Sequence, residues 1–209
     1  LAAYIHRLQT GEGQYIDTSL LEAGIALSVW ESAQYFSGNG VPEPLGSAHR
    51  MAAPYQAIKC SDGYITLGAA NQRTWERFAQ AIGRPDLLER PEYEDDTGRV
   101  RHRDKLAAEI ESVTSSRPRA YWLRVLEEAG VPCGPILNYE EVFSDPHVRA
   151  RGLVQELDHP VGGRVRFVGP AVKMSVTPPS VRRRPPLYGE HTVEVLRELG
   201  RSEGQIQRL

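Results

Sequence analysis

Three loop residues have side chains that could take part in chemistry. His49 and Arg50 lie side by side between a stretch rich in glycine and proline and a predicted hairpin, in the kind of loop where functional residues gather. Asn71 stands where a predicted strand ends and a helix begins, and α/β proteins tend to bind ligands at such ends. Each also has a structural interpretation, as a solvated loop pair and as a helix cap. The residues alone leave both interpretations open.

The segment TGEGQYIDTSLLEAG, residues 10–24, offers a second candidate. Two glycines flank an acid, as in a phosphate-binding loop, but the Lys-Ser/Thr pair is missing and an extended piece follows where a helix should begin. Asp17 carries a carboxylate that could act as a nucleophile or base, yet an acid just ahead of a helix is more often a cap. We therefore interpret the segment as a turn followed by a capped helix.

The remaining polar residues form no recognisable catalytic set. His191, at the start of the last predicted helix, has the same two interpretations as Asn71. The six histidines show no i, i+4 pair and no Glu-x-x-His grouping, so we expect no metal site. A Gly-x-Ser-x-Gly nucleophile elbow is also missing from the sequence.

The composition is that of a folded protein. Of the 209 residues, 40% are hydrophobic and 25% are charged, with a formal net charge of −2, which indicates neither disorder nor a nucleic-acid partner. Cys60 and Cys133 match no metal-ligand or redox spacing, so we expect a reduced, cytoplasmic setting. No apolar run reaches the roughly 18 residues that a membrane helix needs, and we expect no membrane partner.

The elements that must position these residues include both helices and strands. Apolar spacing and breakers predict helices over residues 1–8, 20–36, 71–83, 101–116, 119–130 and 191–200, and two short helices between residues 138 and 152. Alternating runs predict strands over residues 55–60, 64–70, 153–160 and 165–175, and a short strand follows the Pro/Gly turn in the segment that begins at Val131. The fold class is therefore mixed α/β.

Local signals predict where several elements begin or turn. Gly11 suits the left-handed residue that ends a helix, and Ser19 with Glu22 has capping-box spacing. Asp62-Gly63 suits the tight turn of a hairpin. Pro146 after Asp145 suits the first position of a helix.

Six segments together resemble the class III coenzyme A transferase family, the CaiB/BaiF type. Each is a weak signal alone, but they follow the family's order over nearly the whole chain. The segments are LAAYIHRLQTGEGQYIDTSLLEAG, LGSAHRMAAPYQAIKCSDGYITLGAANQRTWERF, AIGRPDLLERPEY, LEEAGVPCGPILNYEEVFSDPHVRARG, VRFVGPAVKMS and RRPPLYGEHTVEVLRELG.

The resemblance implies a domain organisation. Family members are about twice as long, and their first half forms most of a Rossmann-like large domain with the catalytic aspartate, so this chain resembles the C-terminal half. It implies a helix and linker leaving the large domain in residues 1–45, a small α/β domain in residues 46–145, and a return to the large domain in residues 146–209. The nucleophilic Asp is then expected upstream of Leu1, with no catalytic residue in this chain, which alone should be inactive.

The resemblance also assigns positions. Residues Gly46 to Ala53 match a glycine-rich active-site flap of some members, but GSAHRMAA has one glycine. The resemblance therefore favours His49 and Arg50 as the site residues of this loop. Asn71 matches the catalytic Glu of the family's α-methylacyl-CoA racemases, and an amide cannot act as that acid or base. Asp17 matches the motif GQ-x-V/I-D, which does not hold the nucleophile.

The function implied is CoA transfer from an acyl-CoA to a carboxylic acid through an aspartyl-CoA thioester. The CoA thioester would be a substrate, with no permanently bound cofactor, and the enzyme a homodimer of interlocked chains. The alternatives are a racemase or CoA-linked dehydratase of the same family, and a non-catalytic dimerisation or binding module.

Overall fold

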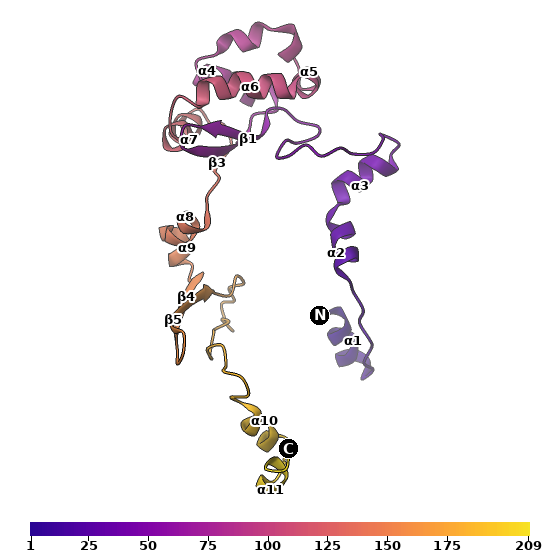
Figure 1. The fold of residues 1–209 in the computed structure, drawn as a ribbon. Coiled ribbons are helices and arrows are strands. Elements are labelled where there is room, and N and C mark those ends of the chain that lie inside the picture. Colours follow the sequence, from indigo (N-terminus) through magenta and orange to yellow (C-terminus); the bar gives the residue numbers. More distant parts are fainter. The chain divides into compact units, whose positions relative to one another are not determined.

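The computed structural model describes residues 1–209, and its contacts divide the chain into two units, Leu1–Gly134 and Pro135–Leu209 (Figure 1). Helices and short antiparallel sheets occur in both the first and the second unit. The predicted mixed α/β class is confirmed. The boundary expected between residues 145 and 146 stays a prediction, and the division by contacts falls earlier, after Gly134.

Unit 1 begins with three helices, α1 (Ala2–Thr10), α2 (Leu20–Leu27) and α3 (Val29–Phe36). Gly11 ends α1 with a φ of 80°, as predicted. The capping box of α2 is also confirmed, because the Glu22 amide donates to Ser19 Oγ at 3.1 Å and the Ser19 amide donates to Glu22 Oε2 at 2.8 Å.

The single helix predicted over residues 20–36 is wrong, because it is interrupted at Ser28. The Ser28 hydroxyl donates to the Ile25 carbonyl at 2.7 Å, and the Ser28 amide bonds to the same oxygen at 3.0 Å. A serine hydroxyl competes in this way with the regular helical ladder, so α2 ends and α3 begins at this residue.

The three-stranded sheet contains β1 (Tyr55–Cys60), β2 (Gly63–Gly68) and β3 (Cys133–Pro135), in that order. β1 and β2 form the predicted hairpin, with Tyr55 opposite Gly68 and Cys60 opposite Gly63. Gly63 has a φ of 148°, a conformation that residues with a Cβ rarely adopt.

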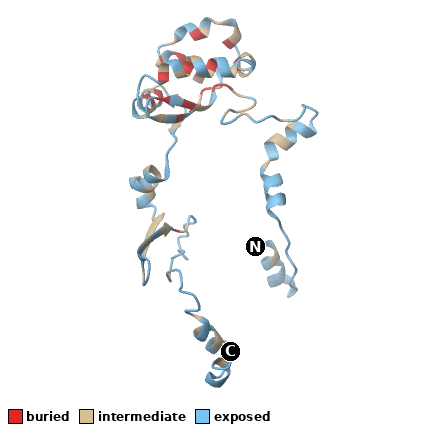
Figure 2. Ribbon diagram, in the orientation of Figure 1, coloured by how far each residue is buried: buried red, intermediate tan, exposed pale blue.

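Helices pack on this sheet and enclose the core. They are α4 (Gln72–Ala81), η1 (Pro85–Glu89), η2 (Pro91–Tyr93), α5 (Asp96–Arg101), α6 (Arg103–Thr114) and α7 (Arg119–Glu128). The buried residues gather in this part of unit 1 (Figure 2). The helices predicted over residues 71–83, 101–116 and 119–130 supply much of the core through Trp75, Phe78, Leu106, Ile110, Trp122 and Leu126. By contrast, α1, α2 and α3 bury no residue.

Unit 2 contains the second hairpin, β4 (Val154–His159) and β5 (Gly163–Val168), and four short helices. The helices are α8 (Tyr139–Ser144), α9 (Pro146–Ala150), α10 (Thr192–Glu198) and α11 (Glu203–Ile206). Asp145 caps α9, as its position before Pro146 predicts, by accepting from the His147 amide at 2.7 Å. No hydrophobic side chain of this unit is fully buried. None of the chain's helices combines the length and apolar character needed to cross a bilayer.

Candidate active-site loop

The loop from Gly46 to Pro54 is held against the hairpin by hydrogen bonds near its start. Gly46 has a φ of 61°, and the Ala48 amide closes a turn onto the Leu45 carbonyl at 3.1 Å. Ser47 Oγ then accepts from the Ala57 amide of β1 at 3.1 Å. The loop therefore folds back onto β1.

His49 is held between two aromatic side chains. Its ring lies edge-on to Trp30 of α3, with centroids 5.5 Å apart, and edge-on to Tyr55 of β1 at 5.2 Å. The His49 Nδ1 atom accepts from the Met51 amide at 3.2 Å. In the neutral ring the proton is therefore on Nε2, which makes that atom a hydrogen-bond donor.

Arg50 lies next to His49 but serves the scaffold. Its Nε donates to Glu31 Oε2 at 2.8 Å, and its Nη2 donates to the Glu43 carbonyl at 2.7 Å. Arg103 of α6 supports the same turn through a bond from Nη1 to the His49 carbonyl at 3.2 Å. Of the neighbouring pair His49 and Arg50, His49 is thus the better candidate for a ligand contact.

Asn71 caps α4, so the structural interpretation of this residue is confirmed. Its Oδ1 accepts from the Thr74 amide at 3.0 Å, which satisfies one of the free donors at the helix start. The same residue lines an open depression of about 550 Å³, together with residues 70, 72 and 94–96 and with Arg99. Capping and lining a ligand site are compatible, because the Asn71 amide nitrogen is not used by the cap.

Arg99 is the functional candidate that the sequence did not reveal. It is buried, with 1% relative exposure, and burial lowers the pKa of its guanidinium. Nε donates to the Ala53 carbonyl at 3.0 Å and Nη2 donates to the Ala70 carbonyl at 2.7 Å. The segment GRVRHRDK contains three arginines and one lysine, and the sequence pattern does not distinguish the buried arginine from the others.

Two other sequence candidates lie elsewhere. Asp17 is exposed ahead of α2, and the cap of that helix is Ser19 and not Asp17. His191 stands at the start of α10 in unit 2, where its Nδ1 lies 3.0 Å from Glu194 Oε2. It makes no side-chain cap for α10. No cluster of three or more metal-ligating side chains is present in the chain.

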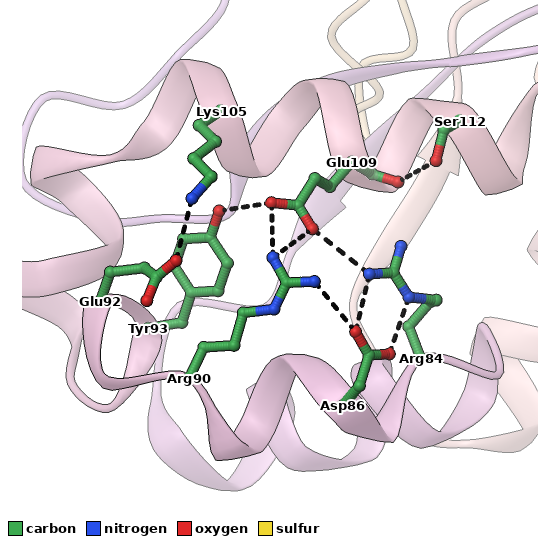
Figure 3. A network of polar contacts seen from close by, with 8 residues as sticks. All are labelled: Arg84, Asp86, Arg90, Glu92, Tyr93, Lys105, Glu109 and Ser112. Carbon is green, nitrogen blue, oxygen red and sulfur yellow. Dashed lines mark hydrogen bonds and ion pairs between the residues drawn. The ribbon is translucent and has the colours of Figure 1, made fainter.

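A separate polar network ties η1 and η2 to α6 (Figure 3). The Glu109 carboxylate accepts from Arg90 at 2.7 Å, from Arg84 at 3.3 Å and from the Tyr93 hydroxyl at 3.0 Å. Burial, and then the bond to Glu109, raise the pKa of Tyr93 to about 12. Because the charges neutralise one another within the network, we assign it to the scaffold.

Comparison with known proteins identifies the class of protein. The family model for CoA-transferase family III matches residues 1–192. The chain therefore belongs to CoA-transferase family III.

Three curated relatives similar to this chain are named as CoA-transferases. The chain is 36% identical over 199 residues to human succinyl-CoA:glutarate CoA-transferase, covering 95% of this chain and 45% of that protein. It is 35% identical to succinyl-CoA:mesaconate CoA-transferase of Haloarcula marismortui, covering 98% of this chain and 51% of that protein. Formyl-CoA:oxalate CoA-transferase of Rhodopseudomonas palustris is 31% identical, with coverages of 99% and 54%. The chain thus spans about half the length of these relatives.

Solved structures of similar proteins also have the fold of this chain. A CaiB/BaiF family protein from Brucella suis superposes with a TM-score of 0.79 at 30% identity, over 95% of this chain and 51% of that one. Rv3272 from Mycobacterium tuberculosis superposes with a TM-score of 0.75 at 21% identity, over 92% of this chain and 50% of that one. The second likeness concerns the fold alone. The recognition made from the six sequence segments is confirmed.

Proposed function

We propose that this chain is the C-terminal part of an acyl-CoA:carboxylate CoA-transferase, with acyl-CoA and a small carboxylic acid as substrates. The observation that carries the proposal is the 36% identity to a succinyl-CoA:glutarate CoA-transferase over 95% of the chain. Two further relatives are named for transfer to mesaconate and to oxalate. Glutarate, mesaconate and oxalate are all dicarboxylates, so we propose a dicarboxylic acid as the acceptor.

In the proposed reaction, an aspartate in a segment before residue 1 attacks the thioester carbonyl and releases CoA as a thiolate. The thiolate attacks the aspartyl carbon of the resulting anhydride, which releases the donor acid and leaves an aspartyl-CoA thioester. The acceptor carboxylate then attacks this thioester, and the released CoA thiolate takes the new acyl group from the anhydride. Each step exchanges one acyl bond for another, so the reaction needs no oxidant and no permanently bound cofactor.

The residues of this chain would form the wall around the acyl group. In the proposed site His49 presents its Nε2–H as a donor, and the acceptor's free carboxylate is a suitable acceptor for it. The His49 ring cannot turn freely, because Trp30 and Tyr55 flank it and its Nδ1 is bonded to the Met51 amide. A donor that is already held in place loses less conformational entropy when the substrate binds.

We also propose that the enzyme is a homodimer of interlocked chains in the cytoplasm. The apolar surface of α2 and α3 supports the assembly, because Leu20, Leu27 and Phe36 are 93%, 88% and 81% exposed. Surfaces of this kind are normally covered by other protein. The two free cysteines, Cys60 and Cys133, are compatible with a reducing compartment.

The test uses the full-length protein that contains this chain. We expect it to transfer CoA from succinyl-CoA to glutarate, mesaconate or oxalate. Liquid chromatography would detect the CoA thioester of the acceptor acid. Borohydride reduction during turnover should trap the aspartyl thioester, and peptide mapping should place it outside residues 1–209. The chain of residues 1–209 alone should show no transfer.

The His49→Phe variant provides a matched test of the proposed donor. It retains a ring between Trp30 and Tyr55 but lacks Nε2–H, and it also lacks the Nδ1 acceptor of the Met51 amide. We expect kcat/KM for the acceptor acid to fall about tenfold, as the loss of one hydrogen bond to the substrate can cause. A trapped thioester within residues 1–209 would contradict the proposed mechanism. Exchange of the α-proton of an acyl-CoA without transfer would instead indicate a racemase.

A further inference from the structure

Arg99 is the only charged residue of the chain that is buried. Its guanidinium donates from Nε to the Ala53 carbonyl at 3.0 Å and from Nη2 to the Ala70 carbonyl at 2.7 Å. Nη1 donates to the Tyr93 carbonyl at 3.0 Å and to Gln72 Oε1 at 3.1 Å. One side chain thus satisfies four acceptors in three segments of the chain, at Ala53, at residues 70–72 and at Tyr93.

Two of these segments carry the candidate site residues. Ala53 ends the loop that holds His49, and Ala70 directly precedes Asn71. Ala53 is held from both sides, since its amide donates to Asp96 Oδ1 at 3.1 Å and its carbonyl accepts from Arg99. The Arg99 side chain is therefore a direct bridge between the loop and the start of α4.

The arrangement is not that of a simple ion pair. The Arg99 guanidinium lies 3.9 Å from the carboxylate of Asp96, too far for a hydrogen bond, and packs over the ring of Trp75 at 5.3 Å. Its hydrogen bonds go to neutral oxygens, three of which are the backbone carbonyls of Ala53, Ala70 and Tyr93. A planar fork with five donors can serve these oxygens together, whereas the single ammonium of lysine cannot.

A buried charge is an expensive way to stabilise a fold, because apolar side chains of similar size often do as well. What Arg99 adds is a defined geometry between the loop that ends at Ala53, the start of α4 and the end of η2. We propose that Arg99 is a positioning residue, which holds the loop of residues 46–53 at a fixed place relative to Asn71 and thereby forms the acceptor side of the site. This inference rests on the proposed function.

The test compares Arg99→Lys with Arg84→Lys in the full-length protein. Arg84 is a matched control, because it also makes a forked contact, to Asp86 Oδ1 at 2.7 Å and Oδ2 at 2.8 Å, but within the scaffold network. The readouts are KM for the acceptor acid, kcat, Tm, and hydrogen exchange of peptides covering residues 46–54 and 55–68.

For Arg99→Lys we expect KM for the acceptor to rise roughly tenfold or more, as a small displacement of a binding group can cause. Exchange of residues 46–54 should quicken while the β1–β2 hairpin stays protected. Arg84→Lys should lower Tm without changing KM or loop exchange. An Arg99→Lys protein with unchanged KM would overturn the proposal, whatever its Tm.

Asp96→Ala keeps the proposal falsifiable if Arg99→Lys does not fold. It removes the acceptor of the Ala53 amide while keeping Arg99 and its hydrogen-bond partners, and we expect the same rise in KM on a smaller scale. An unchanged KM in this variant would then overturn the proposal. If the unsubstituted protein transfers no CoA to any acid, the proposed function fails, and faster loop exchange in either variant still decides whether the loop is held as inferred.

Discussion

Arg50 and Glu31 join the candidate loop to α3, with Arg50 Nε donating to Glu31 Oε2 at 2.8 Å. The side chains are 21% and 45% exposed, so the pair is partly shielded from solvent. The contact lies beside the Trp30–His49 ring contact, which connects the same two segments. An ion pair and an aromatic pair thus hold the loop to a helix that buries no residue of its own.

The first prediction concerns this ion pair. In a double-mutant cycle with Arg50→Met and Glu31→Gln, we expect a coupling free energy of about 1 kcal/mol, the upper range for exposed pairs. The coupling should shrink at high salt, because a partly exposed pair is screened. Denaturant unfolding of the four proteins measures it. A coupling near zero at low salt would show that the pair does not hold the loop.

The second prediction concerns Asn71. Asn71→Ala should lower the free energy of unfolding by about 1 kcal/mol, because the Thr74 amide loses its acceptor. Asn71→Asp keeps an acceptor oxygen at the start of α4 and should unfold close to the parent protein. Denaturant unfolding and CoA-transfer assays are compared for both variants. Equal stability of Asn71→Ala and the parent would argue against the cap.

The third prediction concerns acid stability. The hydrogen bond from Arg84, together with the charges of Arg84 and Arg90, lowers the pKa of Asp86 from 3.8 to about 2. A carboxylate whose pKa is lower in the folded state adds stability that is present above pH 3.8 and is lost as the pH falls through 2. The stability difference between the parent and Asp86→Asn should therefore shrink over this window. A difference that is constant from pH 5 to 2 would contradict the assignment.

The fourth prediction concerns thiol reactivity. Burial, and then the charge of Asp62, raise the pKa of Cys60 to about 11. At pH 8 only about one thiol in a thousand is then ionised, and the thiolate is the reactive form. In a Cys133→Ser variant, iodoacetamide should label native Cys60 slowly and unfolded Cys60 at an ordinary rate. Mass spectrometry follows the label, and rapid labelling of the native protein would contradict the burial of this thiol.

Features set by neighbours in the sequence were predictable. Ser19 and Glu22 form their capping box and Gly11 ends α1, because both depend on residues within one helical turn. The core faces of α4, α6 and α7 were also predictable, since helical periodicity places apolar residues on one side. The break at Ser28 was missed, because apolar spacing continues through it and only the hydroxyl bond to Ile25 interrupts the ladder.

The sequence by itself determined the family, the mixed α/β class and the loop where the candidate residues lie, because these follow from local patterns and from six matching segments. The tertiary structure alone decided which residues act together. The tertiary structure gives the neighbouring residues His49 and Arg50 different surroundings, because His49 lies against two aromatic rings and Arg50 is bound to Glu31. It also selected Arg99 among similar basic residues. Burial and hydrogen-bond partners distant in the sequence give that residue its role, and neither leaves a local signal.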